Sequence, residues 1–591
     1  MKKVLALLMA VCAMGSMAAC GTPIDDDSGS NGVENVYNVE SSSKTKLQVI
    51  HFNGGIGSIW IEKAAERFAK EYKDKSYAKD KKGVYVDFTH TMTIDCNTMA
   101  SASYNVYINE RFSSVNALAQ SGLLLPIDDI VRDETREGGS LDSKLFEQAK
   151  GSLKGNDGKY YGLPHYESFG GLSFNNETFD SSLAYFAAEE ETDKVLYESS
   201  KYGSAYFVTT LDAKRSNGPD GKPDTVDDGL PCSLEELILL MDYFKQTTTY
   251  APIIVSGDYT EHVNYFIAGL WSALAGAEQM RNYYNSEGEI EVVDYDHPDG
   301  PYTNENLFPG IDYIKKPRLK KVMLNQKNGY LGNTMAAKYY ALAMVEIFEK
   351  EGFYCDDSYI STRSHYDAQM NLYLGGTGQY KRAAMLIEAS YWHNESKKAN
   401  CFKQYELIKQ KSADDLNFTF MALPTSYYTA GAQGQDVCLL DISQTYTVIN
   451  GNIANNAELR EAAKDFVRFL YSDYELRAFT VETGMPRAIN YDLTPEEQAS
   501  LPYFYQRLWE LRDNNFGSNL VMLSGTTSAF KQTWASIVIH LTSDNLSPYA
   551  KNSSAFPHFR RNSANPKGTR TIFEDLQISQ SAWNAIYKED R

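Results

Sequence analysis

The chain has 591 residues, of which 43% are hydrophobic, so it can form two or more domains with apolar cores. Its formal net charge of −20 argues against a nucleic-acid binder, which would carry a basic face. Seven scattered cysteines without a CxxC pair and nine dispersed histidines indicate neither a disulfide framework nor a compact metal site.

The first segment has the features of a secretory signal. Two lysines precede an almost wholly apolar run over residues 4–17, which is too short to cross a bilayer as a helix of ~20 residues. Two alanines then lead to Cys20, and the pattern resembles a bacterial lipobox in which Met17 replaces the usual leucine. We therefore expect a lipoprotein signal peptide over 1–19 and lipidation of Cys20, with an ordinary cleaved signal as the alternative.

The following residues, 20–44, are acidic and rich in Ser, Gly and Asn, with little apolar surface to bury. We expect a disordered tether that holds the folded part at the extracellular face of the cell membrane. In a cell with two membranes, the same anchor would face the periplasm. No later apolar run has the length that a membrane span requires.

The folded part begins with a strand–helix–strand pattern. Residues 47–52 predict a strand, three glycines follow as a turn, and apolar residues at helical spacing predict a helix over 61–72. A second strand begins at Gly83 and a third covers 106–108, which indicates a parallel sheet with right-handed crossovers. The glycine turn matches neither the dinucleotide fingerprint nor the P-loop, so no nucleotide cofactor is expected.

Helices become more frequent further along the chain. They are predicted from a capping box at Ser233 and Glu236, from an apolar face over 458–471, and from the start Thr494-Pro495. Residues of about 180–380 combine acidic, glycine-rich loops with helical pieces, which we interpret as an enlarged second lobe. The predicted class is α/β with helix in excess, without an internal repeat.

Tyrosine is unusually frequent, with 42 residues against 27 Phe and 6 Trp. Its side chain joins a flat apolar face to a polar tip, which suits a sugar ring with hydroxyls at its edge. Because surface proteins are often rich in tyrosine, this composition favours a carbohydrate ligand without identifying one.

Several segments, in this order, resemble the extracellular solute-binding proteins of ABC importers, in the family 1 group that includes maltose-binding protein. They are LLLPIDDIV, KYYGLPHYESFGGLSFNNETF, GPDGKPDTVDDGLPCSLEELILLMDYFK, MLIEASYWHNE, FTFMALP and AAKDFVRFLYSDYELRAFTVETGMPRAINYD. The chain departs from this family in its greater length and at Ser390-Tyr391, where a glycine usually precedes the site tryptophan.

The resemblance implies a two-lobed periplasmic-binding-protein fold of type II, with crossover strands between the lobes and a ligand cleft between them. Lobe one would comprise 45–165 plus 438–486. Lobe two would comprise 168–430 plus 490–591.

The resemblance also implies where a ligand binds. Trp392 corresponds to the tryptophan that stacks on a sugar in this family, with core packing as the alternative. On a straight strand, Glu388 and Trp392 would share the face that lines the cleft, and Tyr391 would point away. A bend at this point would reverse that arrangement.

Asn109, Glu110 and Arg111 follow the third strand at its carboxyl end, where open α/β sheets bind ligands. The resemblance implies that the carboxylate and the guanidinium hydrogen-bond sugar hydroxyls, with a salt bridge at a helix start as the alternative. Further ligand candidates, each with a packing or hinge role as the alternative, are Trp60, Trp271 and Arg487.

Four aspartates lie in the segment GPDGKPDTVDDG. Clustered carboxylates repel one another unless a cation or water separates them, so a calcium site is conceivable. The spacing misses the EF-hand pattern, however, and we expect a solvated turn instead. The aspartates concerned are Asp220, Asp224, Asp227 and Asp228.

The leading functional prediction is a lipid-anchored, monomeric binding protein that captures a carbohydrate, in particular an oligosaccharide, and delivers it to a membrane permease. No catalysis is expected, and the transport ATPase would be a separate subunit because the chain has no Walker A motif. One alternative is a surface glycoside hydrolase that uses Glu110 and Glu388 as paired carboxylates. The others are a surface glycan-binding lipoprotein without a permease and the binding protein of a peptide importer.

Overall fold

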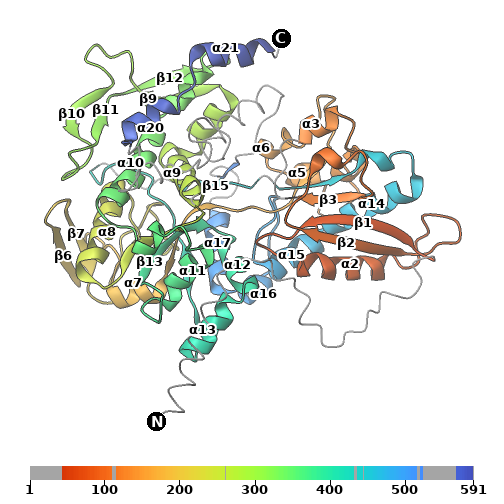
Figure 1. Cartoon of the computed structure of the whole chain (residues 1–591), viewed down its shortest axis with the longest axis horizontal. Coiled ribbons are helices and arrows are strands. Elements are labelled where there is room, and N and C mark those ends of the chain that lie inside the picture. The colour runs from red at the N-terminus through yellow and green to blue at the C-terminus, as the bar shows by residue number, and fades with distance from the viewer. Residues whose placement is uncertain are drawn as a thin grey trace.

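The computed structural model describes residues 43–109, 115–136, 138–259, 261–430, 436–443, 445–514, 520–522 and 567–589. The predicted signal peptide, the lipidation site Cys20, nearly all of the tether and the candidates Glu110 and Arg111 lie outside the described residues. The described residues form a two-lobed α/β molecule, with lobe one at the right of Figure 1 and lobe two at the left.

Lobe one is built on a five-stranded sheet in the order β2-β1-β3-β16-β4. β1 is parallel to β2 and to β3, as the strand–helix–strand pattern predicts, whereas β16 is antiparallel to β3 and β4. The strands are β1 Thr45–Phe52, β2 Val84–Thr91, β3 Val106–Asn109, β4 Gly162–Pro164 and β16 Tyr446–Ile449. The helices around it are α2 Ile59–Glu71, α3 Val115–Gln120, α4 Asp128–Val131, α5 Leu141–Lys144, α6 Glu147–Lys150, α14 Ala457–Leu470, α15 Asp473–Thr483 and α16 Pro495–Ser500.

Helix α2 follows β1 because the sequence between them permits a tight turn. Gly57 has a φ of 70°, which a residue with a side chain rarely adopts. Trp60, Ile61, Ala64 and Phe68 then lie on one buried face. The helix predicted over 61–72 is confirmed, and it begins two residues earlier than expected.

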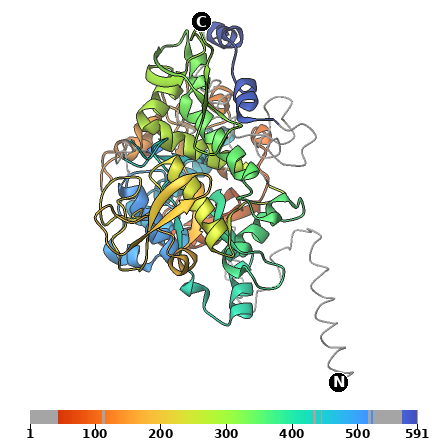
Figure 2. The same ribbon diagram turned by 90° about the vertical axis from the view of Figure 1, so that its left-hand side faces the viewer.

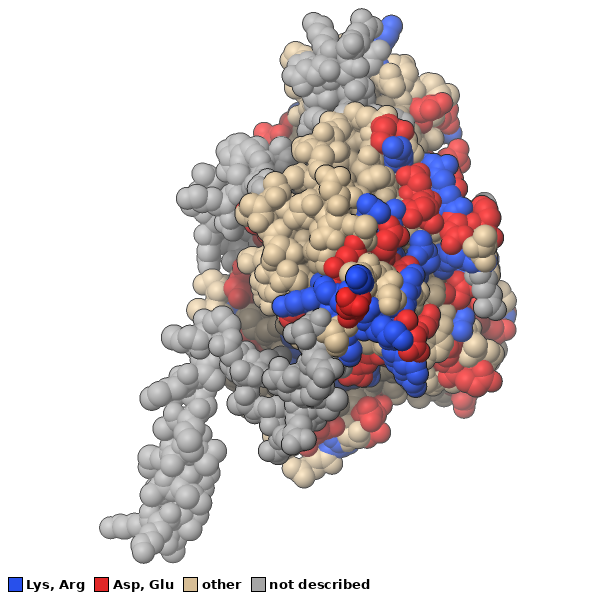
Figure 3. Space-filling view, turned by 90° about the vertical axis from the view of Figure 1, so that its right-hand side faces the viewer, with Lys and Arg blue, Asp and Glu red and all other residues tan. Residues whose placement is uncertain are grey.

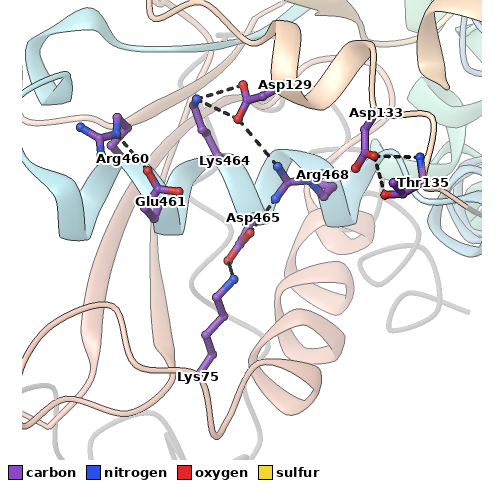
Figure 4. A network of polar contacts seen from close by, with 9 residues as sticks. All are labelled: Lys75, Asp129, Asp133, Thr135, Arg460, Glu461, Lys464, Asp465 and Arg468. Carbon is purple, nitrogen blue, oxygen red and sulfur yellow. Dashed lines mark hydrogen bonds and ion pairs between the residues drawn. The ribbon is translucent and has the colours of Figure 1, made fainter.

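Charged side chains fix α14 against the rest of lobe one. Lys464 contacts both carboxylate oxygens of Asp129 at 2.9 Å, and Arg468 pairs with Asp465 at 2.7 Å. Asp465 also binds Lys75, in the loop that follows α2 (Figure 4). Among the described residues on this side of the molecule, acidic and basic side chains are interspersed (Figure 3).

Lobe two is built on a four-stranded sheet in the order β14-β5-β13-β8, in which β13 and β8 are parallel and β5 is antiparallel to β13 and to β14. The strands are β5 Gly170–Asn175, β8 Ala251–Ile254, β13 Ala383–Ala389 and β14 Phe418–Phe420. The helices around it are α7 Asn176–Ser182, α8 Leu234–Thr247, α9 Glu261–Asn285, α10 Ala336–Lys350, α11 His365–Leu374, α12 Trp392–Lys398, α13 Cys401–Lys409 and α17 Tyr503–Asn514.

The enlarged part of lobe two carries two-stranded ribbons and the last described helices. The paired strands are β6 Lys194–Ser199 with β7 Gly203–Val208, β9 Gly288–Val293 with β12 Leu319–Leu324, and β10 Tyr302–Asn306 with β11 Lys315–Pro317. A further pair, β15 Leu439–Asp441 with β17 Leu520–Met522, lies where the chain crosses between the lobes. Helices α20 Thr569–Asp575 and α21 Gln580–Glu589 pack at the end of this region (Figure 2). The buried indole of Trp583 donates to the carbonyl oxygen of Gln326 at 2.7 Å, which holds α21 in place.

The helix starts that the sequence predicts are present. Ser233 accepts a hydrogen bond from the amide of Glu236, but the Glu236 carboxylate binds the amide of Cys232 rather than completing a capping box. At α16 the box of Thr494 and Glu497 is complete. No helix in the described part of the chain has both the length and the apolar character needed to cross a membrane.

The apolar core does not stop at the boundary between the sheets. One cluster of buried side chains runs from β1 and α2 of lobe one to Trp392 and Phe418 of lobe two. A second cluster fills lobe two and its enlarged region. The boundaries 45–165, 438–486, 168–430 and 490–591 therefore stay a prediction. The cysteines within the described ranges, all with free thiols, are Cys96, Cys232, Cys355, Cys401 and Cys438.

Candidate ligand site at the junction of the lobes

The parallel pair β8 and β13 defines the functional edge of lobe two. The carboxyl ends of parallel strands lie at the same edge of a sheet, which is where α/β folds place their ligands. The chain after β8 carries Tyr259 and His262, and the chain after β13 carries Tyr391 and Glu395. Two segments separated by more than one hundred residues therefore meet at this edge.

The chain bends directly after β13. The strand ends at Ala389, Tyr391 has the helical angles φ −76° and ψ −11°, and α12 begins at Trp392. The expectation that Glu388 and Trp392 share the face of one straight strand is therefore wrong. The structure has the bend that was the alternative, so Tyr391 and Trp392 no longer follow the alternation of a strand.

Trp392 points into the interior of lobe two. Its side chain is fully buried, its Nε1 donates to Oγ of Ser173 at 3.0 Å, and its ring lies 5.0 Å from Phe418 and 5.4 Å from Phe504. Because the side chain is fully buried among protein groups, no part of the indole is open to a ligand in this structure. The structure therefore gives Trp392 the core role that was the alternative.

Tyr391 and Glu395 contact lobe one. A Cβ atom placed on Gly55 would lie 3.4 Å from Cδ2 of Tyr391 and 3.2 Å from Cγ of Glu395. Nearby, Nζ of Lys398 donates to the carbonyl and side-chain oxygens of Asn53 at 3.0 and 2.9 Å. The first loop of lobe one and the start of α12 thus form the junction between the lobes.

Two carboxyl groups lie side by side behind this contact. Glu388 is 1% exposed, and its Oε1 accepts from Nε2 of Gln369 at 2.9 Å. Burial and the neighbouring Glu395 raise the pKa of Glu388 well above its usual value. Burial also raises the pKa of Glu395 to about 7. At neutral pH the pair therefore retains a proton that isolated glutamates would have lost.

Aromatic side chains surround this carboxyl pair. The His262 ring lies 4.8 Å from Tyr259, 6.0 Å from Tyr265 and 6.4 Å from His365, and His365 is 4.0 Å from Tyr366. Burial lowers the pKa of His262 to about 3, so its imidazole is neutral. Together the rings present a polar and aromatic surface at the end of the lobe-two sheet.

Of the residues at this site, the sequence analysis identified only Glu388 and Tyr391 as ligand candidates. The segment SGDYTEHVNYF follows a strand, which is the available signal, but its importance depends on the pairing of β8 with β13. That pairing joins segments far apart in the chain and leaves no local pattern. The missed residues are Tyr259, His262, Tyr265, His365, Tyr366 and Glu395.

On the lobe-one side, two candidates are buried. Asn109 ends β3, is 1% exposed, and donates from Nδ2 to Sγ of Cys96 at 3.5 Å. Trp60 is 3% exposed and packs against His51, His165 and Phe479, at centroid distances of 5.5, 5.1 and 4.9 Å. Both side chains therefore support the loops of lobe one from within.

Trp271 is likewise a core residue. It lies on α9, is 3% exposed, and packs 5.3 Å from the ring of Tyr283. The ammonium of Lys338 is 5.8 Å from its ring. The structure therefore separates Trp271 from the junction and gives it the packing role that was the alternative.

Arg487 lies in the connection between the lobes. It is 1% exposed, and its Nη1 is 2.9 Å from Nδ1 and 3.3 Å from the carbonyl oxygen of His165, in the first crossover. The guanidinium carbon is 4.0 Å from the centre of the Phe479 ring. This arrangement matches the hinge role that was the alternative to a ligand contact.

A buried polar cluster joins the three crossovers, which are the segments between the lobes at residues 165–168 (first), 438–443 (second) and 485–490 (third). Glu167 pairs with Arg512 at 2.6 Å, and both side chains are at most 2% exposed. The amide of Glu167 donates to the carbonyl oxygen of Pro486, and the amide of Ser168 donates to Oδ1 of Asp441 at 3.0 Å. Burial and the charge of Glu167 raise the pKa of Asp441 to about 8.

Three of the four aspartates of the GPDGKPDTVDDG loop gather around Thr225, whose Oγ1 is 3.4, 2.6 and 3.4 Å from Oδ1 of Asp220, Asp227 and Asp228. Asp227 accepts from the amide of Asp220 at 3.0 Å, and Asp228 accepts from the amide of Asp224 at 2.9 Å. Backbone amides and the Thr225 hydroxyl thus satisfy carboxylate oxygens within the loop. Within the described ranges, no group of three or more His, Cys, Asp or Glu side chains is placed to hold a metal ion.

Comparisons with known proteins identify the fold. No family model matches the chain, and no curated protein sequence matches it. Similar solved structures include a chitin oligosaccharide binding protein, with 14% identity, a TM-score of 0.50 and coverage of 92% of this chain and 100% of that one. RafE from Streptococcus pneumoniae, in its apo form, has 11% identity, a TM-score of 0.50 and coverage of 93% and 99%.

A third similar structure is the cyclic alpha-maltosyl-1,6-maltose binding protein from Arthrobacter globiformis, with 10% identity, a TM-score of 0.50 and coverage of 92% and 100%. All three resemblances extend over nearly the whole of both chains. The chain therefore has the two-lobed α/β fold of these three proteins, which is the fold that the sequence resemblance implied.

Proposed function

We propose that this protein is the substrate-binding component of an ABC importer, which captures an extracellular carbohydrate and delivers it to a membrane permease. The observation that carries the proposal is the junction itself, where Tyr391 and Glu395 of lobe two meet Gly55 of lobe one. A polar and aromatic surface at the carboxyl edge of a sheet suits a ring with hydroxyl groups.

The names of two similar structures support an oligosaccharide as the ligand class. One binds a chitin oligosaccharide and the other a cyclic maltosyl-maltose. In our proposal, the ligand binds between the lobes and stabilises their closed arrangement, and the closed form docks on the permease. The protein acts as a monomer and performs no chemistry on the sugar.

The N-terminal part of the proposal rests on the sequence. Residues 1–19 direct export, Cys20 carries the lipid anchor, and residues 20–44 form the tether. Lobe one comprises 45–165 plus 438–486, and lobe two comprises 168–430 plus 490–591. Mass spectrometry of the protein from its membrane fraction tests this part, because an unmodified Cys20 contradicts the anchor.

Ligand binding is tested by thermal shift and calorimetry on the full chain with neutral oligosaccharides, monosaccharides and peptides. Ligand at one hundred times its Kd raises the free energy of unfolding by ~2.7 kcal/mol, which gives a clear shift in Tm. We expect a shift with oligosaccharides. A shift with peptides alone would assign the protein to peptide importers, and hydrolysis of the bound sugar would support the glycosidase alternative.

Tyr391→Ala locates the binding surface. The side chain is only partly buried, so its loss should change stability little while lowering oligosaccharide affinity about tenfold or more, because an aromatic face is removed. Tyr391→Phe keeps the ring and is the matched control. Unchanged affinity in Tyr391→Ala would contradict this location of the site.

A further inference from the structure

The two carboxyl groups of Glu388 and Glu395 have fewer than two cations near them. Oε2 of Glu388 is buried and receives no hydrogen bond from an N–H group or an alcohol hydroxyl group within the described ranges, and the carboxyl groups of Glu388 and Glu395 hydrogen-bond to each other. It lies beside Glu395, and two adjacent carboxyl groups repel each other when both are ionised. Such a pair must either keep a proton or be joined by a cation.

The charged and titratable groups around the pair supply one cation. Lys398 of α12 acts on Glu395, but its ammonium is held by Asn53 of lobe one. His262, which approaches Glu388 to 4.0 Å, is neutral. The remaining titratable groups nearby are Tyr259 and Tyr265 after β8, His365 and Tyr366 of α11, Tyr391 before α12, Cys401 of α13, and His51 of lobe one beside Lys398.

The balance of charge is therefore negative by one when both glutamates are ionised. Rings from three separate elements line the same place, and the face of an aromatic ring attracts a cation. An acid pair that shares a proton, with Glu388 buried and aromatic faces beside it, offers two carboxylate acceptors to an ammonium group, which a neutral hydroxyl group cannot use as strongly.

We propose that the junction selects a ligand that carries a protonated amine, such as an amino sugar, and that Glu395 and Glu388 hold its ammonium group between the tyrosines. This inference rests on the proposed function, since it names the class of carbohydrate that the same site takes. Neutral sugars would bind through the aromatic surface alone.

Binding of the amine must displace the proton that the pair otherwise shares. The ammonium stays protonated, the shared proton passes to the buffer, and both carboxylates become ionised. Amine affinity should consequently rise with pH between 5 and 7, by up to about tenfold per pH unit, because fewer protons then compete with the ligand. A neutral sugar releases no proton, so its affinity should stay constant over this range.

The test is calorimetry on the full chain with the trimer of glucosamine and the trimer of N-acetylglucosamine, in two buffers with different enthalpies of ionisation. At pH 6 we expect proton release with the glucosamine trimer and none with the acetylated trimer. In Glu395→Gln, proton release should disappear and glucosamine affinity should fall at least tenfold, whereas binding of the acetylated trimer is retained. Glu388→Gln should act in the same direction.

Glu71→Gln, an exposed change at the end of α2, is the control and should bind both trimers as the unchanged protein does. If Glu388→Gln does not fold, Glu395→Gln still carries the test because Glu395 is only partly buried. Equal affinity for both trimers without proton release would overturn the inference and leave the proposed function standing. Binding of neither trimer nor any neutral oligosaccharide would overturn both.

Discussion

Two adjacent side chains, Tyr391 and Trp392, have opposite surroundings. Tyr391 contacts the loop of lobe one, whereas Trp392 is fully buried in lobe two. Their separation results from the bend after Ala389, since a residue at a helix start no longer follows the alternation of a strand. Of the two aromatic residues, Tyr391 is therefore the one that lies at the junction of the lobes.

Trp392→Ala should accordingly act on stability. Removing the buried indole leaves a cavity between Phe418 and Phe504, and Oγ of Ser173 loses its hydrogen-bond donor. We expect the free energy of unfolding to fall by ~3–5 kcal/mol, measured by denaturant titration. Trp392→Phe, which keeps a ring, should lose less. Unchanged stability together with lost sugar binding would restore the stacking role.

The sequence predicts those features that depend on neighbouring residues. β1, the glycine turn and α2 follow from local periodicity, and the order of the motifs implies the two-lobed class. The bend at Tyr391 and the position of His262 depend on which strand lies beside β13. Tertiary packing determines that β8 pairs with β13, so neither of these two segments predicts the pairing by itself.

At the scale of elements, the connections between the lobes depend on the buried pair of Glu167 and Arg512. Arg512→Met would leave the Glu167 carboxylate buried without its cation, and we expect a loss of ~3–5 kcal/mol in the free energy of unfolding at neutral pH. Adding Glu167→Gln should restore part of this loss. Lys222→Met is the control, because its pair with Asp436 is exposed and should contribute less than ~1 kcal/mol.

Asp441, in the second crossover, should make stability depend on pH. Its pKa is raised to about 8 in the folded protein, so between pH 4 and 8 the folded state keeps a proton that the unfolded state has lost. Its contribution to stability is complete below pH 4 and declines as pH rises toward 8, by at most ~1.4 kcal/mol per unit.

Asp441→Asn should remove this dependence, since its side-chain oxygen can still accept from the amides of Ser168 and Ser443. Denaturant titrations of both proteins at pH 5, 6, 7 and 8 measure the difference. Parallel curves for the two proteins would mean that Asp441 is already ionised in the folded state.

At the scale of the whole molecule, Gly55 matters because it lies where lobe one meets Tyr391 and Glu395 of lobe two. We expect a larger side chain at this position to increase the distance between the lobes. A Cβ atom there would already lie 3.2 Å from Cγ of Glu395 and in contact with Tyr391, so the two methyl groups of a valine would press on both side chains. We expect ligand-bound Gly55→Val to have a larger radius of gyration by small-angle scattering than the ligand-bound unchanged protein. Its affinity should fall about tenfold, which corresponds to the cost of overpacking.

Ile59→Val, a change at an exposed position close by, should alter neither quantity. If Gly55→Val binds ligand with unchanged affinity and size, the contact seen at Gly55 is not the one that ligand capture requires.

The position of β1 determines how mechanical load would enter this molecule. β1 lies inside the lobe-one sheet and pairs with β2 along its whole length, from Thr45 to Phe52. A pull on the chain before Thr45 would therefore act in shear on many hydrogen bonds at once, rather than unzip them one after another. A force on the predicted tether, residues 20–44, would therefore be borne by lobe one. Lobe two could then move relative to lobe one without stretching the tether.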